Sequence, residues 1–157
     1  MKRNLTFLAV VLFAVALASC SKKSSDEGFR QPAADGWELV SWNGNTDLAG
    51  YIYLQFDAGR FTLYQHVGTL VSGYTQYTGT YTLAEDPAYG TLLSGSYSDG
   101  TPWARSYVVE SWTEKELRMR SLDEAIVSVY GSVVIPARVK EEPIAFPSRG
   151  VAEEPFL

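Results

Sequence analysis

Apolar and polar residues alternate along most of the chain between positions 36 and 135, and glycines interrupt the alternation at short intervals. Residues 51–56 carry an aliphatic residue or Phe at every second position, a turn containing Gly59 follows, and the alternation resumes over residues 61–67. A period of two residues is typical of a strand with one apolar face, so this stretch predicts a β-hairpin. We find no long stretch with the apolar spacing of a helix in this region.

The same reasoning predicts eight strands in a region rich in Tyr, Thr, Val and Trp. They are expected over residues 37–42, 51–56, 61–67, 74–83, 91–98, 103–112, 116–122 and 126–135. Neighbours in sequence are expected to pair, and closing the meander removes its exposed edges. The predicted fold class is therefore all-β, an eight-stranded antiparallel up-and-down barrel with an extended C-terminal tail. Such a barrel is just wide enough to be packed by side chains or to hold one small ligand.

Two glycines stand inside predicted strands, in the similar segments Gly79-Thr80-Tyr81-Thr82 and Gly95-Ser96-Tyr97-Ser98. Glycine weakens a strand interior unless the backbone needs the missing side chain. We therefore expect Gly79 and Gly95 to let a strand bend or to let a neighbouring group approach closely.

The chain changes character after residue 135. Pro136, Pro143, Pro147 and Pro155 fall among acidic residues, and proline removes ladder donors, so residues 136–157 are expected to form an extended tail. Its apolar residues are expected either to cover the barrel wall or to be left for a partner: Ile144, Phe146 and Phe156.

The first twenty residues have the order of an export signal. Lys2 and Arg3 precede an apolar run over residues 5–17, and small residues lead to Cys20, the one cysteine of the chain. The run is shorter than the roughly 20 apolar residues that span a bilayer, so a secretory signal is the better interpretation. Residues 17–20, Leu-Ala-Ser-Cys, resemble the lipobox of bacterial lipoproteins, which implies that Cys20 is acylated after cleavage. The alternative is an ordinary secretory peptide with an incidental cysteine.

Four segments result from this reading: a lipoprotein signal peptide (1–19), a flexible polar tether (20–35), the barrel domain (36–135) and the Pro-rich acidic tail (136–157). Removal of the signal leaves 13 − 2 = 11 basic and 18 acidic side chains, a formal charge of −7. This balance argues against nucleic acid as a partner, because binding phosphate backbones requires a basic patch. The tether residues 24–27, Ser-Ser-Asp-Glu, faintly resemble the acidic surface-export signal of Bacteroidetes lipoproteins, and a generic solvated linker explains them equally well.

Several motifs together resemble a known family. Gly36-Trp37-Glu38 resembles the Gly-x-Trp start of lipocalins, and the segments 56–63, 77–81 and 92–97 follow it in order behind a lipobox. This combination resembles the small lipocalin-like lipoproteins of Bacteroidetes over residues 36–136. The resemblance implies a barrel, a lipid-anchored location, and a Trp37 that closes one barrel end. It also implies a basic residue packed on that Trp, for which the sequence offers Arg118, Arg120 or Arg138.

Catalytic chemistry is not indicated. His66 is the sole histidine, and neither clustered zinc ligands nor a Gly-x-Ser-x-Gly elbow accompanies it, so a surface or hydrogen-bonded histidine is expected. Asp57 and Glu110 could act as the acid and the base in glycoside hydrolysis if the fold brought them together. Positions in turns and on solvated strand faces account for these carboxylates more simply. We therefore expect no enzymatic activity, no catalytic residues, no bound metal and no cofactor.

Aromatic residues are the remaining signal. Several tyrosines occupy the face opposite the aliphatic stripe, where they either stack on a ligand or pack across strands to stabilise the sheet. The candidate ligand-binding residues are Trp37, Tyr51, Tyr53 and Tyr64.

Two functional hypotheses follow. In the first, the protein is anchored through acylated Cys20 in the bacterial cell envelope, on the outer membrane, and its barrel binds a small apolar or amphipathic molecule. In the second, the barrel is filled, and the exterior aromatics or the tail bind a glycan or an envelope protein. An apolar cavity larger than about 300 Å³ would favour the first hypothesis.

Overall fold

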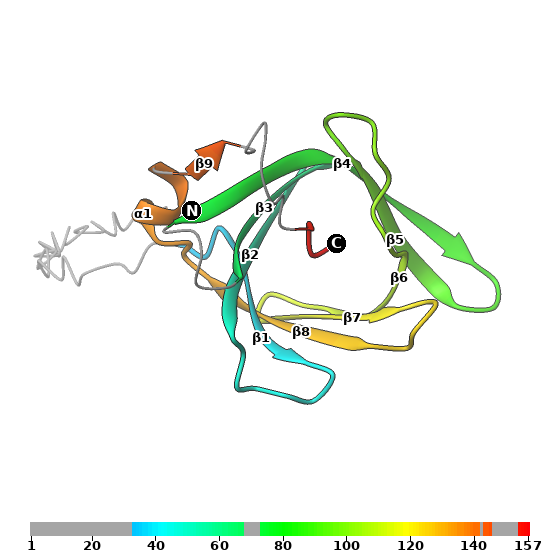
Figure 1. Ribbon diagram of the computed structural model, residues 1–157. Helices are drawn as coiled ribbons and strands as arrows, with labels where there is room; N and C mark the ends of the chain where they lie inside the picture. Colours follow the sequence, from blue (N-terminus) through cyan, green and yellow to red (C-terminus); the bar gives the residue numbers. More distant parts are fainter. Residues whose placement is uncertain (1–32, 68–72, 142, 146–153) are drawn as a thin grey trace, which may run out of the picture. The chain divides into compact units, whose positions relative to one another are not determined.

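Eight antiparallel strands follow one another around a closed ring in the computed structural model, which describes residues 33–67, 73–141, 143–145 and 154–157 (Figure 1). The strands are β1 (Gly36–Trp42), β2 (Gly50–Asp57), β3 (Arg60–Val67), β4 (Tyr74–Asp86), β5 (Gly90–Tyr97), β6 (Tyr107–Trp112), β7 (Glu116–Ser121) and β8 (Val127–Val133). Each pairs with the next, and β8 pairs with β1. The predicted all-β fold, an eight-stranded antiparallel up-and-down barrel, is confirmed.

The β2–β3 hairpin shows how the sequence sets the register. Asp57 lies opposite Arg60. Between them, Ala58 and Gly59 have φ values of 45° and 80°. Two consecutive positive φ values match the right-handed twist of the flanking strands, which makes this a tight reversal of the favoured kind. The reversal places Leu54 opposite Leu63, and both side chains are fully buried, as the alternation predicts.

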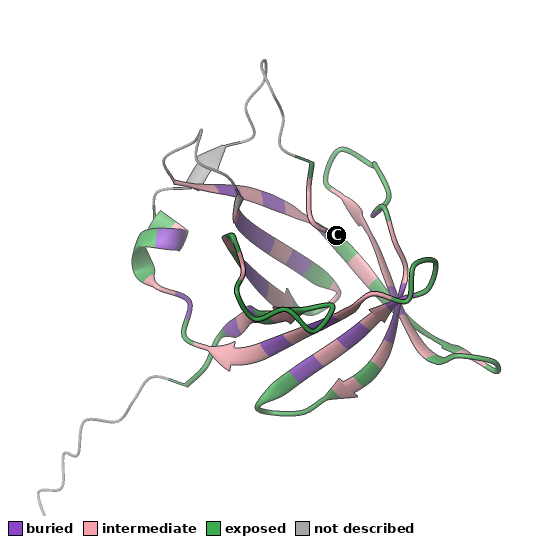
Figure 2. Cartoon of the chain, turned by 60° about the horizontal axis from the view of Figure 1, so that its bottom comes forward, coloured by how far each residue is buried: buried purple, intermediate pink, exposed green. Residues whose placement is uncertain are grey.

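Buried and more exposed residues alternate along the strands, and the inward side chains form one core (Figure 2). Aromatic residues close one end of this core. Trp37, at the start of β1, packs edge-to-face on Trp112 with ring centroids 6.4 Å apart, and Phe56 lies 5.2 Å from Trp112 and 4.9 Å from Tyr81. Such aromatic pairs add roughly 0.5–1.5 kcal/mol beyond the area that they bury. Aromatic rings thus cover the core at one end of the barrel, and a surface hollow of about 600 Å³ lies beside them.

Gly79 and Gly95 permit close approaches, as predicted. A Cβ at Gly79 would lie 2.0 Å from the carbonyl oxygen of Ser96, and a Cβ at Gly95 would lie 2.5 Å from the ring of Trp103. Trp103 covers Gly95 and donates its backbone N–H to the Gly95 carbonyl at 2.9 Å. The strand expected from residue 103 therefore begins only at Tyr107, because Trp103 serves as a core plug ahead of it.

The tail departs from the extended conformation that its prolines predict. Residues Ala137–Glu141 form the short helix α1, and β9 (Pro143–Ala145) pairs in parallel with the start of β4. Pro136 directly precedes α1, where its missing N–H interrupts no helical hydrogen bond. Val139 of α1 is fully buried, and Lys140 forms an ion pair with Asp35. Within the described residues, no helix is both long enough and apolar enough to cross a membrane.

Helix α1 covers the outer face of the barrel over β2 and β3. There Val139 and Ile135 form a second apolar cluster with Tyr53 and Tyr64, which lie opposite each other on the two strands. Of the tail residues expected to cover the wall, Phe156 lies inside the barrel mouth instead, while Phe146 and the side chain of Ile144 are outside the described residues.

Candidate ligand site at the open end of the barrel

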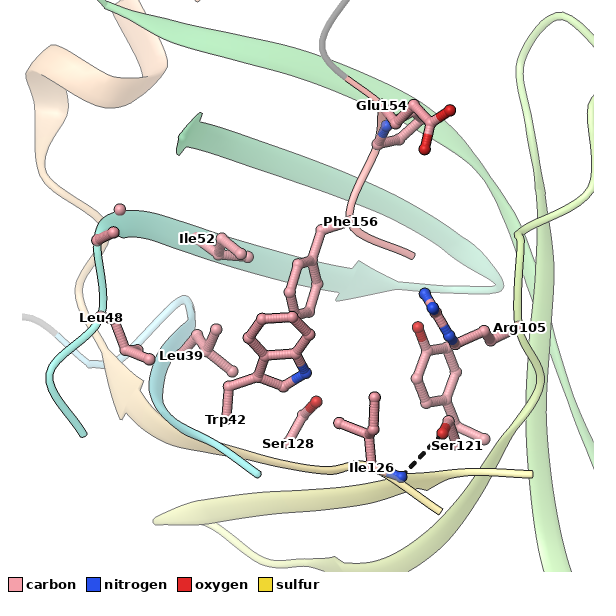
Figure 3. A pocket seen from close by; sticks show the side chains of 14 residues that line it. Leu39, Trp42, Leu48, Ile52, Arg105, Ser121, Ile126, Ser128, Glu154 and Phe156 are labelled. Carbon is pink, nitrogen blue, oxygen red and sulfur yellow. Dashed lines mark hydrogen bonds between the residues drawn. The ribbon is translucent and has the colours of Figure 1, made fainter. Parts of the chain in front are cut away.

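A cavity of about 330 Å³ opens at the end of the barrel opposite the aromatic cluster, where β1 ends and β2 begins. Apolar side chains from separate elements converge on it (Figure 3): Leu39 and Trp42 from β1, Ile52 from β2, Ile126 from the turn before β8, and Phe156 from the tail. Its volume reaches the lower end of the range of small-molecule sites, which is roughly 300 Å³.

Five polar side chains line the same cavity, and one of them, Glu154, belongs to the tail. The hydroxyls of Ser121 and Ser128 belong to residues that are almost completely buried, and Ser121 Oγ accepts a hydrogen bond of 3.0 Å from the backbone N–H of Ile126 (Figure 3). Burial raises the pKa of Tyr107 to about 12, so its phenol stays neutral at physiological pH. These groups supply hydrogen bonds without placing a net charge in the apolar space.

Arg105 is the fourth polar residue, and its charge is already paired. Its Nε and Nη2 atoms donate to Glu124 Oε2 at 3.0 and 2.7 Å. The guanidinium is therefore held at the mouth by its partner, where it can meet the polar group of an amphipathic molecule. Both side chains remain partly exposed, so this pair contributes little to stability.

The end of the chain forms one wall of the cavity. Phe156 packs edge-to-face on Trp42 with ring centroids 5.8 Å apart. Gln65, whose side chain is 1% exposed, fixes this segment on both sides of Pro155: its Nε2 donates to the Glu154 carbonyl at 3.0 Å, and its Oε1 accepts from the Phe156 N–H at 2.9 Å. The wall is thus attached to β3 by a pair of partly buried hydrogen bonds.

The residues chosen from sequence as ligand-binding candidates lie elsewhere in the structure. Tyr53 and Tyr64, each 5% exposed, come together on the outer face beneath α1, whereas Tyr51 is 55% exposed. Trp37 lies at the opposite end of the barrel, where it lines a separate surface hollow of about 600 Å³. Cys20, the expected lipid-attachment residue, falls outside the described residues.

Sequence reasoning missed the residues that do line the cavity. Trp42 and Ile126 stand at strand ends, and the end of a strand is the least certain feature of an alternating pattern. Phe156 carried no periodic signal, because it follows prolines and acidic residues. Trp42 and Ile126 could have been found from their positions along the chain. The topology of an up-and-down barrel brings together the strand ends that lie on the same rim.

The polar residues weighed for catalysis have structural partners. His66 Nδ1 donates a hydrogen bond of 2.6 Å to the Gly73 carbonyl, so the expected hydrogen-bonded histidine is confirmed. Glu110 accepts hydrogen bonds of 2.9 Å from both Arg118 and Arg120, two of the residues weighed as partners of Trp37. Across the part of the chain that the structure describes, no three His, Cys, Asp or Glu side chains cluster as metal ligands.

Asp57 and Glu110 belong to strands that are not neighbours. β1, β8 and β7 lie between β2 and β6 in the sheet. Burial raises the pKa of Glu110, but the hydrogen bonds and charges of Arg120 and Arg118 outweigh it, and the pKa lies below 4.5. A general acid needs a raised pKa, so Glu110 is arranged for pairing with arginine.

Comparison with known proteins is uninformative about activity. No protein-family model and no curated protein matches the sequence. Among solved structures, the barrel is similar to the crystal structure of an uncharacterized protein from Bacteroides eggerthii. The TM-score is 0.46 at 17% identity, and the match covers 64% of this chain and 98% of that one.

Proposed function

We propose that this protein is a non-catalytic binding protein that holds a small apolar or amphipathic molecule in the open end of its barrel. The observation that carries the proposal is the apolar cavity of about 330 Å³ formed by Leu39, Trp42, Ile52, Ile126 and Phe156. An apolar molecule that fills such a space gains about 25 cal/mol for each Å² of apolar surface removed from water. The hydroxyls of Ser121 and Ser128 provide hydrogen bonds for a polar group.

The contacts of the tail end favour this function over the alternative, in which the tail engages a glycan or an envelope protein. Phe156 and Leu157 pack against the barrel core. Since these residues are already used within the molecule, the barrel mouth is the better-supported binding surface.

A cavity-narrowing variant tests the proposal. Ile126 is only partly buried at the rim, so Ile126→Trp should narrow the cavity and obstruct its entrance without overpacking the core. Val40→Trp is the matched control, because Val40 is 44% exposed and lies next to the inward-facing Leu39. With N-phenyl-1-naphthylamine as the fluorescent probe, we expect the wild-type chain and Val40→Trp to bind alike and Ile126→Trp to bind about tenfold more weakly, which corresponds to 1.4 kcal/mol. Equal binding by all three chains would place the probe outside this cavity.

We further propose that the protein is anchored to the bacterial cell envelope, on the outer membrane, through an acylated Cys20. The proposal rests on the Leu-Ala-Ser-Cys motif behind a charged and apolar leader. Two or three acyl chains anchor a protein stably, since each buried CH₂ contributes roughly 0.8 kcal/mol. A barrel held at the membrane surface in this way is placed close to a source of apolar ligands.

A further inference from the structure

The last four residues of the chain divide the open end of the barrel into two spaces. Glu154 and Pro155 line the 330 Å³ cavity, and they also line a second cavity of about 780 Å³ that extends to Tyr77, Tyr97 and Ala104. Figure 1 shows the end of the chain inside the ring of strands. Withdrawal of this segment would join the two spaces, so the segment sets the size of molecule that the barrel can hold.

The barrel wall holds this segment as it would hold a ligand. Gln65 forms two hydrogen bonds with this segment, to Glu154 and Phe156. In addition, the Leu157 carbonyl oxygen accepts hydrogen bonds from the Tyr97 hydroxyl at 2.7 Å and from the Ala104 N–H at 3.2 Å. Leu157 is 1% exposed in the core cluster. Pro155 fixes its own φ and therefore lowers the entropic cost of holding the segment extended.

We infer that residues 154–157 are a displaceable internal ligand of the barrel, and that the molecule that replaces them is an acyl chain bearing an amide or carboxyl group. The apolar chain takes the space of Phe156 and Leu157. An amide takes over both hydrogen bonds of Gln65, accepting from Nε2 and donating to Oε1, whereas a carboxylate takes over only the bond from Nε2. One of these replacements is needed, because a buried amide left without partners is costly. This inference rests on the proposed function and specifies its ligand class.

Two probes of different length test the inference. N-phenyl-1-naphthylamine is small enough for the 330 Å³ cavity. 11-(dansylamino)undecanoic acid is too large for that cavity, and we expect it to extend from there across the position of residues 154–157 into the second cavity. Apparent affinity falls in proportion to the fraction of molecules in which the site is open, so deletion of residues 154–157 should raise affinity for the long probe about tenfold or more. Affinity for the short probe should not rise, because the deletion also removes Phe156 from the wall of its cavity. An acetylated Glu-Pro-Phe-Leu peptide should compete with the long probe on the deleted chain, and a scrambled peptide should not.

A substitution at the attachment point separates release of the segment from a direct effect on the probe. Gln65→Leu should lower affinity for the long probe in the deleted chain, because the polar group of the probe loses its partner. In the full-length chain the loss should be smaller, because the same substitution also releases the segment. Gln55→Leu is the control, since Gln55 Nε2 donates to the Asp35 carbonyl, away from the tail end. If thermal unfolding shows that the deleted chain does not fold, the full-length Phe156→Ala/Leu157→Ala chain takes its place.

The outcomes distinguish the two proposals. Binding of neither probe to any chain would contradict the proposed function itself. Binding of the short probe, with equal affinity of full-length and deleted chains for the long probe, would overturn the internal-ligand inference and leave the binding function standing. Exchange of the segment between two copies would appear as a dimer of the full-length chain that the deletion abolishes, and it too would overturn displacement by a small molecule.

Discussion

Single residues determine how closely neighbouring strands approach in this barrel. A Cβ atom at Gly79 would clash with the carbonyl oxygen of Ser96 on β5, and it would lie 2.7 Å from the ring of Phe61. Gly131 on β8 differs, because a Cβ there would meet only Val40 Cγ1, at 3.5 Å. The two glycines therefore have opposite roles: one is required by packing, and the other leaves room for a side chain.

Alanine substitutions measure this difference. Gly79→Ala should lower the free energy of unfolding by about 2 kcal/mol, because backbone and a core ring must move to admit the methyl group. Gly131→Ala should leave stability unchanged or raise it slightly, since the native backbone accommodates alanine there and the unfolded chain loses freedom. Urea unfolding followed by Trp fluorescence gives both values. Equal losses for the two variants would contradict the close approach at Gly79.

The sequence identified core residues well and the residues that line the cavity poorly, for a physical reason. An inward position such as Leu54 or Leu63 is set by the two-residue period of its own strand. Whether an outward tyrosine contacts solvent, a ligand or a covering helix depends on other elements. Tyr53 and Tyr64 were predicted on the outer face, but the helix that covers them comes from a tail whose sequence shows no strand or helix period.

Elements outside the barrel stabilise it from one side. Helix α1 has five residues, which is too short to be stable alone, so its stability comes from packing. Val139 provides that packing on Tyr53 and Tyr64, and the ion pair between Lys140 and Asp35 fixes the helix near the start of β1. The strands could be predicted because each carries its own alternating pattern, whereas α1 and β9 depend on a surface that exists only once the barrel has formed.

Truncation of Val139 tests this dependence. Val139→Ala should lower the free energy of unfolding by about 2 kcal/mol, from two lost methyl groups and the cavity that they leave. Val134→Ala is the control, because Val134 is 39% exposed. Calorimetry should show a clear drop in Tm for the first variant only. A loss confined to Val134→Ala would mean that α1 does not cover the barrel.

A second element-scale prediction concerns the charges that join β6 to β7. Arg118 and Arg120 hold the pKa of Glu110 below 4.5 despite its burial, so the folded state favours the charged carboxylate. The ion pairs of Glu110 stabilise the fold fully at pH values above the pKa that this carboxyl group has in the unfolded chain. The stabilisation is lost as the pH falls through the lower pKa that the group has in the folded chain. Glu110→Gln should therefore be less stable than the wild type at pH 7, and the difference should shrink as the pH falls below about 4.5.

Urea unfolding across this pH range measures the effect. Arg120→Gln removes one of the two hydrogen bonds to Glu110. Its loss of stability relative to the wild type should also shrink as the pH falls, but by less than the loss in Glu110→Gln. A difference between wild type and Glu110→Gln that stays constant from pH 7 to pH 3 would contradict the pairing.

At the scale of the whole molecule, aromatic rings cover the core at one end of the barrel, and an apolar cavity opens at the other. These rings lie at the end that contains Trp37, and the opposite end carries the cavity and the inserted tail residues. The closed eight-stranded topology follows from alternation and turn positions in the sequence. The cavity could not be predicted in this way, because its volume depends on how side chains from β1, β2, β8 and the tail pack against one another.

The proposed lipid anchor is tested on the whole molecule. Cys20→Ser should abolish incorporation of radiolabelled palmitate and move the protein from the membrane fraction to the soluble fraction. Ser19→Ala, which leaves the thiol in place, should retain the label. Unchanged label in Cys20→Ser would rule out acylation at this residue.

Native mass spectrometry of the full mature chain, purified from its own host, tests most directly whether the open end of the barrel is a ligand site. We predict a co-purifying mass on the wild type and on Val40→Trp, and its loss from Ile126→Trp, which narrows the cavity and obstructs its entrance. A chain without any bound mass that also fails to bind the fluorescent probes, or a bound mass that Ile126→Trp retains, would contradict a ligand site at the open end of the barrel.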